Sequence, residues 1–257
     1  MGNGQVGLVV GAARKSGLKW SRSLCGAAVL ALTSFAAHGD QISEFHYTIT
    51  RDGETIGNHL VTVTPEGPST TVEAKTELEV TFGPLTLYKL QHLRQETSRD
   101  GELEAMTAFT NKNGDVYEIA ITREPQGYRR VVNGRSETFD DSVKVLALWH
   151  EDLFKYSSFL SPMEDRTYRI TVDYVGSDKL DLLDRTIESF HYRISGDTNR
   201  ELWFDNVGRI LKVRLLDHDT EIEYILNAMS ESARKLADEE AMTTEAERAK
   251  TRLAARR

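Results

Sequence analysis

The sequence has almost no cysteine, since Cys25 is the single one among 257 residues. A lipidated cysteine follows the apolar part of a leader, whereas Cys25 opens it, so lipid attachment is not expected here. Cys25 also lies in a segment that we expect to be removed on export. The remaining chain then has neither disulfides nor thiol chemistry, and its stability must come from a hydrophobic core.

Acidic residues are absent from residues 1–39, which contain four basic residues and then the apolar run Leu24 to Ala37. This order is typical of a secretory signal peptide. Small side chains suited to cleavage occur at residues 36–39, and we favour a mature start near Asp40. The sequence therefore predicts a periplasmic or secreted protein.

Long apolar runs are also missing. No segment reaches the about 20 residues that a membrane-spanning helix needs, so no transmembrane segment is expected in the mature chain. Removing the four basic leader residues leaves 32 − 4 = 28 Lys and Arg against 40 Asp and Glu, a net charge of −12. Such a chain repels nucleic acid, which is not expected as a partner.

Local catalytic and metal-binding motifs are not found either. The six histidines after residue 39 lack zinc-site spacing, and the mature chain has no Gly-x-Ser-x-Gly elbow, so we expect no metal, no cofactor and no catalytic residue. "WHED", with His150 beside Glu151 and Asp152, is interpreted as a solvated helix turn. "DHDTEIE", with alternate carboxylates from Asp217 to Glu223, is interpreted as a hairpin and not a calcium site.

The features that are present indicate β-structure. In "TVEAKTELEVTF", apolar and charged residues alternate, as in a strand with one buried face. The same period recurs along the chain, near residues 45–49, 117–121, 168–174, 190–194, 211–215 and 222–226. Turn residues separate the runs at Asp52-Gly53, Asp100-Gly101, Asn113-Gly114, Asn133-Gly134, Gly176-Ser177-Asp178 and Asn206-Val207-Gly208. Such pairs favour hairpins, so consecutive strands should pair antiparallel.

Roughly a dozen strands are too many for a flat sheet. We predict a mainly β fold: a strongly curved antiparallel meander, as a half-barrel or open barrel, forming a single domain over residues 40–227. Helical spacing from Val145 to Tyr156 predicts a short helical cover near residues 141–160. Residues 228–257, rich in Ala, Glu and Arg, are expected to form a helical or disordered tail.

Some predicted strands are apolar on both faces, which raises the question of what covers the second face. Either the helix or an overlapping strand covers it, or a concave apolar groove takes a lipid or another hydrophobic ligand. The residues expected at this boundary are Tyr88, Leu90, Trp149, Phe154 and Trp203. Asp205, beside Trp203, is assigned to the turn that follows and not to catalysis.

Three stretches carry a resemblance: "FHYTITRDGETIG", "LALWHEDLF" and "ELWFDNVGRILKVRL", in that order after a signal peptide. They resemble a family of secreted bacterial proteins classed as a domain of unknown function, similar to antiparallel half-barrel envelope proteins such as the lipoprotein-localisation carriers. The resemblance implies a β half-barrel and an envelope location, and transfers no catalytic residue. The family's middle motif has Trp followed by Asn, whereas Trp149 is followed by His150.

Three functions follow as hypotheses. The first is a non-catalytic exported protein that holds a lipid or other hydrophobic ligand in its curved sheet. The second is an envelope scaffold with a filled interior, which binds a protein partner. The third is a hydrolase whose site is assembled from distant residues. An open or a filled concave face separates the first from the second.

Overall fold

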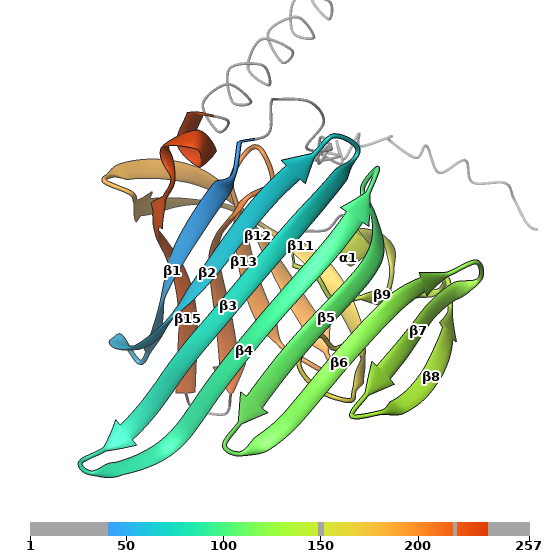
Figure 1. Ribbon diagram of the computed structural model, residues 1–257. Coiled ribbons are helices and arrows are strands. Elements are labelled where there is room, and N and C mark those ends of the chain that lie inside the picture. Colours follow the sequence, from blue (N-terminus) through green and yellow to red (C-terminus); the bar gives the residue numbers. More distant parts are fainter. Residues whose placement is uncertain (1–40, 149–151, 218–219, 236–257) are drawn as a thin grey trace, which may run out of the picture.

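The computed structural model describes residues 41–148, 152–217 and 220–235, which form one 15-stranded sheet (Figure 1). The expected signal peptide lies outside these residues. The first eight strands are β1 (Ser43–Arg51), β2 (Glu54–Glu66), β3 (Ser69–Phe82), β4 (Leu85–Arg99), β5 (Glu102–Lys112), β6 (Asp115–Glu124), β7 (Gly127–Val132) and β8 (Arg135–Asp140). The remaining elements are β9 (Val143–Val145), α1 (Asp152–Lys155), β10 (Ser158–Leu160), β11 (Thr167–Leu182), β12 (Arg185–Gly196), β13 (Arg200–Phe204), β14 (Ile210–Asp217) and β15 (Thr220–Met229).

The predicted antiparallel meander is confirmed. Strands β1 to β8 pair in chain order, as do β10 to β15, and β1 pairs with β15 to join the two series. Four of the predicted two-residue turns have positive φ at both positions, for example 55° at Asn113 and 96° at Gly114. This conformation fits the twist of a hairpin, and Asn-Gly or Asp-Gly adopts it at low cost. Local turn chemistry therefore sets the order of these strands.

The sheet curls into a nearly closed, barrel-like form, with β8 and β9 at its two ends. We call the concave face, which carries most of the buried side chains, the inner face, and the opposite face the outer face. Alternation along each strand separates them: in β4, His92 and Arg94 point inward while Leu93 points outward. In Figure 1, strands β2 to β6 cross the front and β12 to β15 lie behind.

The inner face is filled by the segment between β8 and β11. Leu146, Leu153 and Phe159 belong to the main buried cluster, together with side chains of β1, β3 and β11 to β15. A second cluster joins Val145 and Leu160 to β5, β6 and β7. The concave side of the described sheet is therefore packed with the chain's own side chains.

Arg130 of β7 fastens this segment to the sheet. Its guanidinium donates to the carbonyl oxygen of Arg166 at 2.9 Å and pairs with Glu137 and Asp165, each at 2.8 Å. The side chain is buried and its planar group lies over the Phe139 ring. Because both ends of the guanidinium are engaged, the 161–166 loop is held against β7 and β8.

The prediction of a helical cover near residues 141–160 is wrong in its extent. In the described part of this range only α1 is helical, and β9 and β10 on either side of it pair parallel to each other. The residues from Val145 to Ala147, like Phe159 and Leu160, are buried regardless of helical phase. The spacing predicted an amphipathic helix with one buried face, but these residues are buried on several sides. Tertiary packing therefore overrides the local pattern.

Gly176-Ser177-Asp178 is not a turn either, because it lies within β11. The register slips there, between Tyr174 and Gly176, and the hairpin turns later, at Leu183 and Asp184. The part of the hairpin beyond the slip lies over the outer face, since Leu182 and Leu183 share a hollow with Ile225 to Asn227 of β15. In Figure 1 this gold hairpin crosses behind β15.

The end of the domain lies slightly beyond the predicted residue 227, because β15 continues to Met229. Ser230 then caps a helical turn over residues 231–235: its Oγ accepts the Ala233 N–H at 3.2 Å and the Glu44 N–H at 3.1 Å. The rest of the predicted tail lies outside the described residues. Among the described helices, none combines the length and apolar character needed to cross a membrane.

Candidate functional site

The structure places the five residues of the predicted boundary in different environments. Leu90 is buried beside Ile49 and Leu78, and Tyr88 packs against the same cluster from the inner face. Phe154 of α1 contacts the rings of Tyr192 and Phe204, at centroid distances of 5.0 and 6.0 Å, also on the inner face. Trp149 lies outside the described residues. Of the four described residues, Tyr88 and Leu90 therefore belong to one cluster, and Phe154 packs against another part of the inner face.

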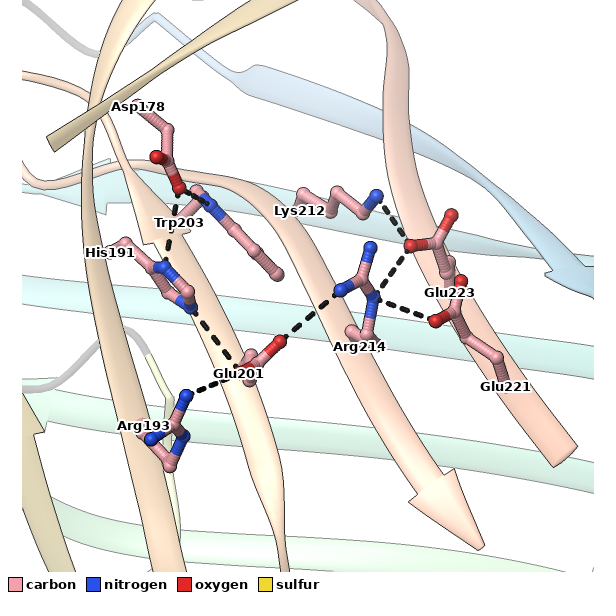
Figure 2. Close-up of polar contacts among 9 residues, drawn as sticks. All are labelled: Asp178, His191, Arg193, Glu201, Trp203, Lys212, Arg214, Glu221 and Glu223. Carbon is pink, nitrogen blue, oxygen red and sulfur yellow. Dashed lines mark hydrogen bonds and ion pairs between the residues drawn. The ribbon is translucent and has the colours of Figure 1, made fainter. Parts of the chain in front are cut away.

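Trp203 lies on the outer face, opposite Leu202 and Phe204, and is only 4% exposed. One side of its indole stacks on the His191 imidazole, with centroids 4.3 Å apart and planes 16° apart. Lys212 and Arg214 provide cations 5.3 and 5.2 Å from the ring centre. At these distances the aromatic ring attracts both cations, so Lys212 and Arg214 form favourable cation–π contacts with the indole. Figure 2 shows the whole arrangement.

The cover of Trp203 is thus an overlapping hairpin and charged side chains, instead of a helix or a ligand. Asp178, from the part of β11 that crosses the outer face, accepts the Trp203 Nε1–H bond at 2.8 Å. The same carboxylate lies 3.2 Å from Nδ1 of His191. One of the two explanations left open by the sequence, an overlapping strand, therefore accounts for Trp203.

Carboxylates and cations alternate through the rest of this cluster. Glu201 pairs with Arg193 and Arg214, at 3.2 and 3.3 Å, and Arg214 also pairs with Glu223 at 2.9 Å. Burial alone would raise the pKa of the Glu223 carboxyl, but hydrogen bonds from Lys212 and Arg214 lower it below its ordinary value. The charged side chains of this cluster therefore balance one another across β12 to β15.

The turn that follows Trp203 has the predicted role. The Asp205 carboxylate is buried, accepts the N–H groups of Val207 and Arg209 at 3.1 and 2.9 Å, and pairs with the Arg209 guanidinium. These bonds close the β13–β14 hairpin locally. Within "DHDTEIE", Asp217 at the end of β14 pairs with Thr220 at the start of β15, whereas His218 and Asp219 lie outside the described residues.

The inner face contains a polar row that the sequence did not reveal. His59, Thr76, His92 and Thr110 are cross-strand neighbours on β2 to β5. The His59 Nδ1 lies 2.8 Å from Thr76 Oγ1, and the His92 Nδ1 lies 2.9 Å from Thr110 Oγ1. Burial, reinforced by the nearby Arg94 cation, lowers the histidine pKa values to about 4 and about 3. These imidazoles are neutral at pH 7 and already paired.

The outer face of β2 to β7 offers an open hollow of about 810 Å³. Its apolar lining comes from side chains that alternate with the inner ones, chiefly Leu60, Leu93, Phe109, Ala120 and Val131. We call this surface the outer trough.

Register brings the members of the outer trough together. Leu60 pairs with Lys75, Lys75 with Leu93, and Leu93 with Phe109, so one row crosses four strands. Leu93 is 49% exposed and Phe109 37% exposed, although both lie in the middle of long strands. Glu73, Lys75 and Glu118 add charges to the lining. Apolar residues at the solvent-facing parity were the signal in the sequence, but only the strand register joins them.

A single antiparallel sheet rolled around its own filled core defines a class of barrel-like β-proteins. Within that class, the chain belongs to the family described as "Domain of unknown function (DUF6134)", whose model matches residues 47–227. A solved structure, a "Beta-barrel-like Protein of Domain of Unknown Function DUF1849 from Brucella abortus", is similar in fold, with a TM-score of 0.54 and 9% identity. The similarity covers 75% of this chain and 98% of that one. No curated protein matches the sequence.

Proposed function

We propose that this protein is an exported, non-catalytic binding protein that holds a hydrophobic ligand, such as an acyl chain, in the outer trough. The observation that carries the proposal is the row of Leu60, Leu93 and Phe109 in the middle of the sheet, where apolar side chains face solvent in register. Exposed apolar surface of this kind marks binding sites. Because the chain's own side chains fill the inner face, we place the ligand on the outer face.

The size and chemistry of the outer trough suit an elongated apolar molecule. Its volume of about 810 Å³ lies within the roughly 300–1,000 Å³ typical of ligand sites. Lys75, which pairs with Glu77 at 3.1 Å, is a cation in the lining, and Glu73 and Glu118 are carboxylates there. An acyl chain along Leu93 and Phe109 would place a carboxylate or other small polar head near Lys75.

Export is supported by the leader composition and by a mature chain without cysteine, which needs no redox protection in an oxidising compartment. A non-catalytic role is supported by the surroundings of His191. Although Asp178 and Glu201 flank this imidazole, its ring is covered by the Trp203 indole, and its described contacts include no nucleophile. A general base must reach the substrate, and this one faces its own network.

The proposal is tested by titrating the exported protein with a dansyl-labelled fatty acid. The double substitution Leu93→Glu and Phe109→Glu should weaken binding by about tenfold or more, since each places a charge on the trough floor. Val116→Glu with Val175→Glu changes exposed apolar residues elsewhere and should leave binding unchanged. Equal affinity of the trough variant and the wild type, or no binding by the wild type, would refute the proposal.

The filled inner face also favours a second function, that of an envelope scaffold for a protein partner. In the described sheet β8 pairs only with β7, so its other edge is a place where a partner strand can add. Pull-down from the envelope with wild-type protein and with a Thr138→Pro edge variant tests this function. An identical set of captured proteins would exclude the β8 edge as the docking site.

A further inference from the structure

The β3–β4 hairpin ends in a tip that projects from the sheet. Its strands are the long β3 and β4, and Figure 1 shows the tip at the lower left, extending past the neighbouring hairpins. Phe82 pairs with Leu85 across a two-residue loop of Gly83 and Pro84. Thr81 pairs with Thr86 just before this loop, and a bulge leaves Leu87 without a cross-strand partner between Thr86 and Tyr88.

This tip carries the most exposed large apolar side chains of the described residues. Phe82 is 74% exposed, Leu85 61% and Leu87 57%. Leaving side chains of this size in water forgoes the favourable free energy of transferring them to an apolar environment. Three of them within six residues form a concentrated apolar surface, unlike the single exposed residues found on most proteins.

Charge is absent from the tip and balanced at its base. No charged residue occurs from Val80 to Tyr88. Immediately below, the Lys89 Nζ lies 3.7 Å from the Glu79 carboxylate, which also accepts the Thr86 hydroxyl at 2.7 Å. Because the tip is neutral and the charges below it are paired, the tip can move from water into an apolar environment without burying an unpaired charge.

The shape of the tip indicates what covers it. A stable protein interface needs about 800 Å² on each partner, and a convex tip with three large side chains offers much less. A lipid bilayer needs no complementary shape and accepts apolar side chains to the depth of the headgroup boundary. Apart from the bulge at Leu87, the paired hairpin backbone suits this environment, because unpaired N–H and C=O groups are costly in lipid.

We propose that the β3–β4 tip inserts Phe82, Leu85 and Leu87 into the surface of a lipid bilayer. This membrane contact goes beyond the proposed function and does not depend on it, since the outer trough begins several residues further along β4. Because the tip is neutral, binding is driven by apolar burial. It therefore needs neither anionic lipid nor low ionic strength.

Co-sedimentation of the exported protein with phosphatidylcholine vesicles tests this proposal. The triple substitution Phe82→Ser, Leu85→Ser and Leu87→Ser should lower the vesicle partition coefficient by about tenfold or more. The matched control, Ile42→Ser with Val116→Ser and Val175→Ser, removes three exposed apolar side chains elsewhere and should stay within about twofold of the wild type. The trough variant should bind vesicles like the wild type, which separates this proposal from the previous one.

Three results would overturn membrane contact: no vesicle binding by the wild type, equal binding by the tip variant, or binding that appears only when phosphatidylglycerol is added. A second readout covers the case in which the triple variant misfolds. Adding phosphatidylcholine vesicles should shift the tryptophan emission of Phe82→Trp to shorter wavelength, by more than it shifts the emission of the wild type. An unshifted spectrum would mean that the tip stays in water.

Discussion

The Nε1–H of Trp203 donates to Oδ2 of Asp178 at 2.8 Å, and this bond joins β13 to a strand that is not its neighbour in the sheet. Strand β12 separates the two along the sheet, so the bond forms only because β11 bends across the outer face after Gly176. The bond therefore holds the distal part of the β11–β12 hairpin over the indole.

Removing this acceptor should destabilise the fold modestly. We expect Asp178→Ala to lower the free energy of unfolding by about 1 kcal/mol, because it leaves the buried indole N–H without its partner. Urea unfolding followed by tryptophan emission measures the change. Asp173→Ala, on an exposed part of the same strand, should change stability by less than about 0.5 kcal/mol. A similar loss in both variants would mean that the bond to Trp203 contributes nothing specific.

Replacing Arg130 should loosen the segment that fills the inner face. Arg130→Met keeps the length of the side chain but removes its bonds to the Arg166 carbonyl, Glu137 and Asp165, so unfolding should become easier by about 3 kcal/mol. Limited proteolysis should then cut within residues 161–166. Arg129→Met, which breaks an exposed pair with Glu124, serves as the control. Equal protease resistance in both variants would contradict this role of Arg130.

The two inner-face histidines should make the protein sensitive to acid. Their folded-state pKa values, about 4 for His59 and about 3 for His92, lie below the ordinary 6.5. Below pH 6.5 the unfolded chain therefore binds protons that the folded chain does not. The free energy of unfolding should fall as pH drops from about 6.5 toward 4, by about 2 kcal/mol for each histidine at pH 5.

Denaturant unfolding at pH 7.5 and pH 5 checks this pH dependence. His92→Gln should remove about half of the histidine contribution, while His46→Gln, at an exposed position, should leave it unchanged. A stability that stays constant between the two pH values, or a slope unaffected by His92→Gln, would show that the neutral imidazoles are not responsible.

Much of the fold can be predicted from the sequence, because the patterns that specify strands and hairpin turns are local. Alternation within one strand, and Asn-Gly or Asp-Gly at a turn, act over a few residues and predict the hairpins that the structure contains. The segment from Val143 to Leu160 shows where such signals fail. Val145, Leu146, Leu153, Phe159 and Leu160 are buried among β5 to β7 and β11 to β15, which lie far away in sequence, so their spacing does not indicate the local conformation.

The candidate site was less predictable for the same reason. The sequence places Trp203 on the parity opposite Leu202 and Phe204, as the structure does, but its cover depends on a bend in β11 about 25 residues earlier. The outer trough depends on register: Leu93 and Phe109 are 16 residues apart and meet only when β4 and β5 pair as they do. Side chains that converge across strands cannot be found from the period of one strand.

Gly57 gives a final prediction about the packing of the inner face. It lies in β2 between Ile49 of β1 and Leu78 of β3, and a Cβ there would stand 2.2 Å from the Glu77 carbonyl oxygen and 2.6 Å from Leu78 Cα. Backbone atoms cannot move aside as a flexible side chain can. Gly57→Ala should therefore force β2 and β3 apart and lower the free energy of unfolding by about 3 kcal/mol, within the range of overpacked cores.

The matched control for Gly57→Ala is Asn58→Ala, one position along β2 on the exposed parity, which should cost less than about 0.5 kcal/mol. Both variants are compared by thermal and urea unfolding. If Gly57→Ala is as stable as Asn58→Ala, β2 and β3 can separate locally without disturbing the row from Ile49 to Leu90. The close approach at Gly57 would then be unnecessary for the curvature of the sheet.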